Sequence, residues 1–277
     1  DLVKFDGDNT AIKFSYNEST EGLYTLLNIS TQKGITNFDM EYLALTPEAK
    51  QLLEKRKEAY TTLSGNLLKY IPQSAIAYTM MGLSGEGSVV NISGCEENQL
   101  FGTLKSIETI SKSLKGDAAL IVESIDKLGF TLLCQAKDME SVMALGQIFN
   151  AEWAPHGNGY KCNWNGMTLY ASVSEDVCAL SNCRDITTLT PLSSHKSAEI
   201  NGAQVYMNID PQQNADTALT SMSTNGLSMG GLEIALMHNM IKSTIDNIEI
   251  KSYGNRNQVE IKFLNEDMSL YKFINNK

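Results

Sequence analysis

The stretch GDAALIVESIDKLGFTLLCQAKDMESVMALGQIFNA, residues 116–151, decides the expected fold. Two apolar runs, 117–124 and 130–136, flank the polar turn IDKLG, and this arrangement is typical of a β-hairpin. Asp138 can then cap a helix over 139–149, because apolar residues follow it at helical spacing. The stretch therefore predicts two strands with a helix packed on one face.

The same kind of unit recurs along the chain. A small residue, an alanine and an apolar run open the expected strands at 74–80, 117–122 and 202–209, and a helical pattern follows each of them. The recurrence predicts an α+β fold, in which antiparallel sheets with about four helices packed on one face are built from repeated strand-helix units. Outside the first helix, the helical patterns span residues 96–115, 139–149 and 214–241.

These patterns divide the chain into three segments. Residues 1–30 predict a meander of strands, residues 31–69 a connector, and residues 70–277 the α+β domain. In the connector, Thr46-Pro47-Glu48 predicts the start of a helix that continues to about Tyr70, because a capping residue and a proline stand at its first turn.

Residues 245–275 predict a second meander, of three strands. Two of its apolar runs are eleven residues apart, as are two runs near the N-terminus, so Tyr24 aligns with Tyr271. We interpret this spacing as an internal repeat in which residues 1–30 are the tail of a preceding copy.

The formal net charge is −10 and the sequence pI is about 4.9. Contact with a phosphate backbone needs clustered Lys and Arg, so the sequence predicts no nucleic-acid partner and no anionic membrane surface. No uncharged apolar run reaches the length of about eighteen residues that a spanning helix requires. The chain begins at Asp1 rather than Met, and we expect that an upstream segment with any targeting signal has been removed.

The cysteines are odd in number and widely spread, unlike the disulfide frameworks of small secreted domains. We therefore expect mostly reduced, buried thiols, with Cys134 in the core because it is in phase with the apolar residues of its strand. A bridge across a turn between Cys178 and Cys183 is an open alternative. The five residues are Cys95, Cys134, Cys162, Cys178 and Cys183.

The richest local chemistry follows the central stretch, where both tryptophans of the chain occur. Aromatic rings there can stack on a glycan or a peptide, and His156 with Cys162 can contribute to a metal site. Alternatively, the tryptophans close the end of the core and Asn165-Gly166 forms a tight hairpin turn. The candidate ligand-binding residues are Trp153, His156, Tyr160 and Trp164.

No catalytic signature accompanies His195 or His238, which have no acid or base partner nearby in the sequence. We therefore predict no catalytic residue, no cofactor and no resident metal, and a non-catalytic module that binds or scaffolds a partner. The alternative is a metal-dependent or nucleophile-based hydrolase whose residues the fold brings together.

Several of these patterns are similar to a family of exported, Bacteroidetes-type lipoproteins of unknown function. They are the segment IPQSA at 71–75, GDAA at 116–119, the strand 130–136 with its helix 139–149, and the closing meander. The resemblance covers about residues 70–277. It implies a location in the cell envelope, in the periplasm or at the cell surface, with an N-terminal lipid anchor that this chain does not include. The expected partners are then another envelope protein, a peptide or a glycan.

Overall fold

The computed structural model describes residues 9–12, 22–58, 60–84, 116–124, 129–135, 152–164, 166–174, 177–186, 191, 200, 202–213 and 241–275. The chain divides into two compact units, each of which contains an antiparallel sheet. Unit 1 comprises Asp1–Glu54, Ile125–Lys127 and Tyr206–Lys277, and unit 2 comprises Lys55–Ser124 and Leu128–Val205.

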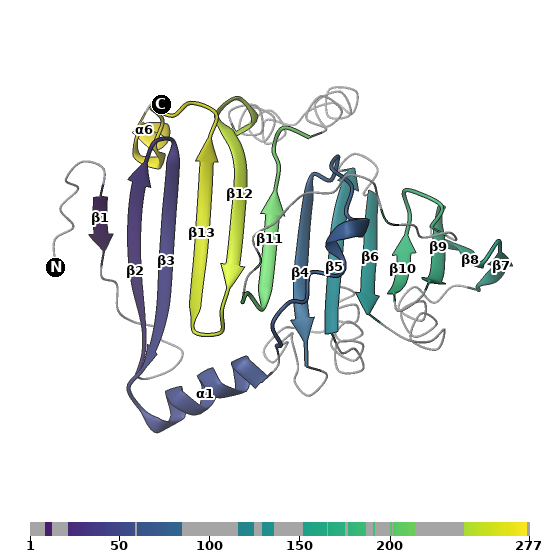
Figure 1. The fold of residues 1–277 in the computed structure, drawn as a ribbon, viewed down its shortest axis with the longest axis horizontal. Helices are drawn as coiled ribbons and strands as arrows, with labels where there is room; N and C mark the ends of the chain where they lie inside the picture. The colour runs from purple at the N-terminus through teal and green to yellow at the C-terminus, as the bar shows by residue number, and fades with distance from the viewer. Residues whose placement is uncertain are drawn as a thin grey trace. The chain divides into compact units, whose positions relative to one another are not determined.

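The sheet of unit 1 brings the two ends of the chain together. Strand β3 lies directly beside β13 and pairs with it antiparallel, so purple and yellow strands are neighbours in Figure 1. The strands, in their order across the sheet, are β1 (Asn9–Ile12), β2 (Leu23–Gln32), β3 (Ile35–Ala44), β13 (Arg256–Phe263), β12 (Ile245–Ser252) and β11 (Val205–Ile209).

The β2–β3 hairpin fixes which side chains share a face of this sheet. Its two-residue turn, Lys33-Gly34, has positive φ at both positions, 47° and 74°, as a type I′ turn requires. The register then runs without a break from Gln32 opposite Ile35 to Leu23 opposite Ala44. Because side chains alternate along a strand, the central part of the unit 1 sheet has one mainly apolar face and one mainly polar face. The apolar face carries Leu27, Ile29, Phe38, Met40, Val259 and Ile261.

Helix α1 (Pro47–Glu58) begins where the sequence predicts it. The Oγ1 atom of Thr46 accepts a hydrogen bond from the Ala49 N–H at 3.2 Å, which is the cap that the Thr-Pro-Glu pattern indicates. Ala49 and Leu53 then pack with Leu23, so the helix covers one end of β2 and β3.

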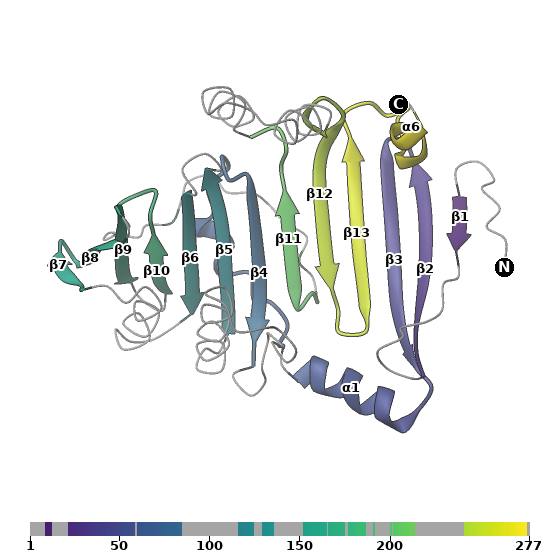
Figure 2. The same cartoon turned by 180° about the vertical axis from the view of Figure 1, so that it is seen from behind.

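The sheet of unit 2 is built around the predicted hairpin. Strands β5 and β6 pair antiparallel with Ala118 opposite Cys134, which confirms the hairpin within 117–136. The sheet continues to β4 on one side and to β10, β9, β8 and β7 on the other, as Figure 2 also shows from behind. The bounds are β4 (Ala77–Leu83), β5 (Gly116–Ser124), β6 (Gly129–Gln135), β10 (Val177–Ser181), β9 (Met167–Ser174), β8 (Gly159–Trp164) and β7 (Ala154–His156).

The strand pairing on either side of the predicted Asn165-Gly166 turn agrees with that prediction, and Asn165 itself lies outside the described residues. Trp164 pairs with Met167, so two residues connect β8 to β9. Gly166 has a φ of 81°, which favours glycine, and its N–H donates to the Oδ1 atom of Asn163 at 3.1 Å.

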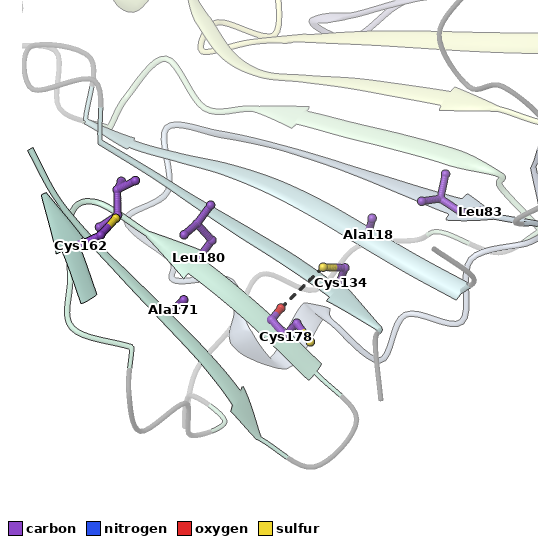
Figure 3. Packing of buried hydrophobic residues seen from close by; sticks show 8 residues of the cluster. Leu83, Ala118, Cys134, Cys162, Ala171, Cys178 and Leu180 are labelled. Atoms are coloured by element: carbon purple, nitrogen blue, oxygen red, sulfur yellow. Dashed lines mark hydrogen bonds between the residues drawn. The ribbon is translucent and has the colours of Figure 1, made fainter. Parts of the chain in front are cut away.

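One face of the unit 2 sheet carries what we call the cysteine core. Its buried side chains come from six neighbouring strands, and Figure 3 shows the thiol of Cys134 directed at the carbonyl oxygen of Cys178, 3.9 Å away. The prediction that Cys134 is a small core residue is therefore confirmed. The members of the cysteine core are Leu83, Ala118, Cys134, Cys162, Leu169, Ala171, Cys178 and Leu180.

The opposite face of the unit 2 sheet holds a buried carboxylate. The side chain of Asp117 is 1% exposed, and it accepts hydrogen bonds from the N–H and O–H of Ser64 and from the N–H of Gly65, at 2.8 to 3.1 Å. The N–H of Asp117 donates to Gln135 Oε1 at 2.7 Å. Asp117 therefore ties the irregular segment 60–76 to the sheet, and apolar residues of that segment such as Leu67 become buried.

The predicted α+β class is wrong for the part of the chain that the structure describes, which is mainly antiparallel strand. The α-helices with both ends in the described ranges are α1 and α6 (Leu270–Asn275), and α1 ends at Glu58 rather than near Tyr70. Residues 68–70 form only a single 3₁₀ turn. The helices expected at 96–115, 139–149 and 214–241 lie outside the described residues, apart from Ile241.

The third strand expected in the C-terminal meander is also wrong, because residues 270–275 form α6. The hydroxyl of Ser269 accepts a hydrogen bond from the N–H of Lys272 at 3.2 Å, which caps the helix. Phe273 then meets Phe263 with ring centroids 6.2 Å apart. Tyr271 is therefore helical whereas Tyr24 lies in β2, and the correspondence on which we based the internal repeat fails.

Candidate functional site

The four residues that the sequence singles out do not share one face of the sheet. Register places Tyr160 and Trp164 on the face of the cysteine core, and Trp153 packs against the same core. His156 pairs with Gly159, so by alternation its side chain lies on the opposite face. The structure thus groups the three aromatic residues and separates His156 from them.

The two tryptophans are neither fully buried nor exposed. Both are partly buried against the cysteine core, as the alternative of a closed core end predicts. The Nε1–H group of Trp153 is buried without a hydrogen-bond acceptor among the described residues, so packing rather than polar contact positions this ring. Part of each indole surface is therefore in contact with the core rather than available to a ligand.

His156 contacts an acidic residue instead of a cysteine. Its Nε2 atom lies 3.1 Å from Oδ2 of Asp185, and its ring centroid lies 5.7 Å from that of Tyr170. Cys162 is buried on the other face of the sheet, where burial raises the pKa of its thiol. Within the described ranges, no three His, Cys, Asp or Glu side chains converge closely enough to hold a metal ion.

The disulfide alternative between Cys178 and Cys183 does not hold, because neither residue forms a disulfide. Cys178 lies opposite Cys134 in the β6–β10 pairing, whereas Cys183 follows Ser181, which lies opposite Thr131 toward the other end of β6, so the two residues are too far apart along the sheet for a disulfide. Cys95, His195 and His238 lie outside the described residues.

A polar cluster that the sequence gave no reason to expect surrounds Cys183. The Thr131 hydroxyl donates to Glu123 Oε1 at 2.6 Å and meets the Ser181 hydroxyl at 2.8 Å, and Ser181 Oγ lies 3.4 Å from the Cys183 sulfur. Arg184 Nε lies 3.2 Å from Glu123 Oε1, close enough for an ion pair although the angle does not make a hydrogen bond.

This cluster does not activate the exposed thiol of Cys183. Desolvation, with a smaller contribution from the Glu123 charge, raises the pKa of Cys183 against the opposing effect of the Ser181 and Thr131 hydrogen bonds. A raised pKa keeps the thiol protonated at neutral pH, and the thiol is a much poorer nucleophile than the thiolate.

Unit 1 contains a cavity of about 300 Å³ on the polar face of its sheet. Its side chains come from β2, β3, β13 and β12 and form two rows that cross these strands. Phe38 contributes its main chain, since its side chain alternates to the apolar face. The first row is Asn28, Asp39, Gln258 and Lys251, and the second row is Ser30, Asn37, Glu260 and Glu249.

Hydrogen-bonded strand pairing holds both rows in place. Neighbouring strands are about 4.8 Å apart, so each row of four side chains extends about 14 Å across the sheet. The rows present amides, carboxylates, a hydroxyl and an ammonium group toward one cavity. Such a surface offers both hydrogen-bond donors and acceptors at fixed spacing.

The charged groups of the cavity are unequally neutralised. Lys251 Nζ lies 3.2 Å from Glu249 Oε2, and both side chains are largely buried, with 18% and 22% of their surface exposed. Asp39 accepts two hydrogen bonds from the guanidinium of Arg256, one of them from Nε at 2.6 Å. Glu260 has no hydrogen bond or ion pair among the described residues.

The position of Glu260 makes this imbalance unfavourable. Glu260 lies directly opposite Glu249 in the β12–β13 pairing, on the same face of the sheet. Like charges in directly opposed positions destabilise a sheet, because their β-carbons are only about 5 Å apart. Sequence inspection missed this cavity, since its residues become neighbours only once β3 pairs with β13.

The fold and the cavity together define a mainly antiparallel β protein with a polar site on an open sheet face. No protein-family model matches the chain, and no curated protein or solved structure is significantly similar to it. Among the described residues, no helix has both the length and the hydropathy that a membrane crossing requires.

Proposed function

We propose that this protein is a non-catalytic binding module and that the polar cavity of unit 1 is its binding site. The observation that carries the proposal is the convergence of eight polar side chains from four paired strands on one cavity of about 300 Å³. Small polar ligands and side chains of partner proteins are recognised by such fixed sets of donors and acceptors. The sheet supplies the rigidity, so little ordering entropy is lost on binding.

The binding function is favoured over the hydrolase alternative by the state of Cys183, the exposed thiol of unit 2. Cys183 and the hydrogen-bonded chain of Ser181, Thr131 and Glu123 resemble a nucleophile with a proton relay. The raised pKa of the Cys183 thiol opposes that role. In the cavity of unit 1, by contrast, the carboxylates and amides are suited to recognition without any bond being broken.

A panel of small probes tests the binding function. The probes are capped glycine pentapeptides with a central Lys, Arg, Glu or Gln, together with cellopentaose and chitopentaose as neutral glycans. Nuclear magnetic resonance titration of the ¹⁵N-labelled chain should show at least one probe that shifts resonances of the cavity residues. Asn37→Leu places an apolar side chain in the second row and should abolish the shift, whereas Thr168→Leu, on an exposed position of unit 2, should preserve it. No shift with any probe, or equal shifts in both variants, would overturn the proposal.

The same proposal includes a place for the protein. The likeness of residues 70–277 to exported lipoproteins supports a location in the cell envelope, where the partner would be another envelope protein, a peptide or a glycan. Expression together with whatever native coding sequence precedes Asp1, followed by palmitate labelling and cell fractionation, tests this location. An unlabelled product in the cytosolic fraction would contradict it.

A further inference from the structure

The opposed pair of Glu249 and Glu260 identifies the charge that the cavity lacks. Lys251 neutralises Glu249, and Asn247 Nδ2 adds a contact at 3.5 Å to its Oε1 atom. Glu260 receives no such partner from the described residues, although it is half-buried and faces a second carboxylate. A cation bound in the cavity beside Glu260 would convert this repulsion into attraction.

The groups around Glu260 suit a nitrogen cation that carries several N–H donors. Asn37 lies directly opposite Glu260 on β3, and Gln258 lies two residues before it on the same face of β13. The side-chain carbonyl oxygens of both amides accept hydrogen bonds, as does the Glu260 carboxylate. Lysine ammonium has three donors and arginine guanidinium has five, so either can use more than one of these acceptors.

We propose that the cavity binds the lysine or arginine side chain of a partner polypeptide and that Glu260 is the carboxylate that pairs with it, an inference that rests on the proposed binding function. Glu260 is then retained for recognition at a cost to the stability of the free sheet. Proteins commonly accept such local destabilisation at binding sites.

Replacement of Glu260 by glutamine separates recognition from stability. Glu260→Gln keeps the shape of the side chain and removes its charge, so it should raise the melting temperature of the free protein by relieving the repulsion with Glu249. The same variant should weaken binding of the lysine and arginine pentapeptides by about tenfold or more. A residue with a merely structural role would not combine a higher melting temperature with lost binding.

Matched controls distinguish the local effect from net charge. Glu266→Gln makes the same change of charge at an exposed position after β13, and it should leave both the melting temperature and the peptide affinity nearly unchanged. Pentapeptides with norleucine or citrulline in place of lysine or arginine are neutral isosteres. They should bind the wild-type chain at least about tenfold more weakly than the charged peptides.

The outcomes separate this inference from the function on which it rests. A lower melting temperature for Glu260→Gln, or equal affinities for charged and neutral peptides, would overturn the cation site. If the glycan or glutamate probes bind the cavity while the cationic peptides do not, the binding function is supported and the cation site is contradicted. If no probe binds, the binding function and the cation site are both contradicted.

Discussion

Asp117 in unit 2 and Glu260 in unit 1 are both carboxylates on strands of antiparallel sheets, but their surroundings differ in kind. Asp117 is almost fully buried, and its oxygens accept hydrogen bonds from Ser64 and Gly65. Glu260 is half-buried, faces Glu249, and has no described partner. The Asp117 carboxylate has its hydrogen-bond donors within the protein, whereas the Glu260 carboxylate has no donor or cation among the described residues.

The two sheets differ in the same way as their carboxylates. The unit 2 sheet has buried side chains on both faces, those of the cysteine core on one face and those of Asp117 and Ile121 on the other. Its polar groups must be satisfied internally, because an unsatisfied buried group costs stability. The unit 1 sheet keeps its polar face open, where water or a ligand can satisfy the same kinds of group. We therefore expect substitutions in the unit 2 sheet to lower the stability of the protein, and substitutions on the polar face of unit 1 to affect ligand binding.

The largest effect is expected for Asp117→Ala. The change removes a buried carboxylate, leaves the part-buried N–H groups of Ser64 and Gly65 without their acceptor, and releases the segment that Asp117 ties to the sheet. We expect the free energy of unfolding to fall by about 3 to 5 kcal/mol, as measured by urea denaturation. Asp117→Asn keeps one acceptor oxygen and should fall between this variant and wild type. A loss below about 1 kcal/mol would contradict the structural role that we assign to Asp117.

A smaller effect is expected for Trp164→Ala. The indole is partly buried against the cysteine core, so its removal should cost about 2 kcal/mol, less than the 3 to 5 kcal/mol of a fully buried aromatic residue. Trp164→Phe keeps much of the apolar contact and serves as the control. If Trp164→Ala left stability unchanged but removed binding of the glycan probes, the aromatic end of unit 2 would be a recognition surface, and the contrast between the units would be lost.

The buried sheet should also show a pH dependence that comes from Cys134. Desolvation, with a smaller contribution from Cys178, raises the pKa of this thiol to about 12. In the unfolded chain the thiol ionises near its ordinary pKa, so between about pH 9 and pH 12 unfolding releases a proton and stability falls as the pH rises. The thiol contributes a slope of up to about 1.4 kcal/mol per pH unit, and below that range its contribution is fully present.

Urea denaturation of Cys134→Ala between pH 8 and pH 10.5 measures that slope. The variant should lose stability less steeply than wild type as the pH rises. Its stability at pH 8 should be lower than that of wild type, because alanine fills less of the buried space that the Cys134 side chain occupies. Cys183→Ala is the comparison: desolvation also raises the pKa of this thiol, but the residue is exposed, so its removal should change the slope less than Cys134→Ala does. Identical slopes for the wild type and Cys134→Ala would show that the thiol is not desolvated in the folded chain.

The sequence predicts correctly those elements whose signals are local. The hairpin within 117–136, the helix start at Thr46 and the two-residue turn at Asn165-Gly166 each depend on a few adjacent residues. The first two are confirmed, and the strand pairing agrees with the third. Strand β3 was missed, although Phe38, Met40 and Tyr42 alternate with polar residues along it. We predict only a connector over residues 31–69, which include this strand.

Short apolar runs explain the errors near the C-terminus. The run Leu270–Phe273 is too short for periodicity to distinguish a strand from a helix, and the capping signal at Ser269 is what decides for α6. The site has no local signal at all. Asp39 and Gln258 become neighbours only through the register between β3 and β13, and no pattern within either strand specifies that pairing.

The smallest effect is expected for Arg256→Gln, at the edge of the polar face of unit 1. Arg256 is bound to both oxygens of Asp39, and this hydrogen bonding is the main reason that the pKa of Arg256 is raised. The two side chains are nevertheless 48% and 33% exposed, so water and salt screen the pair. We expect Arg256→Gln to cost less than about 1 kcal/mol in urea denaturation, and the difference should vanish in about 1 M NaCl, where the Debye length is only about 3 Å. A cost as large as that of Asp117→Ala, or one that persists in high salt, would mean that the polar face of unit 1 also stabilises the fold, and the separation between a structural sheet and a recognition sheet would not hold.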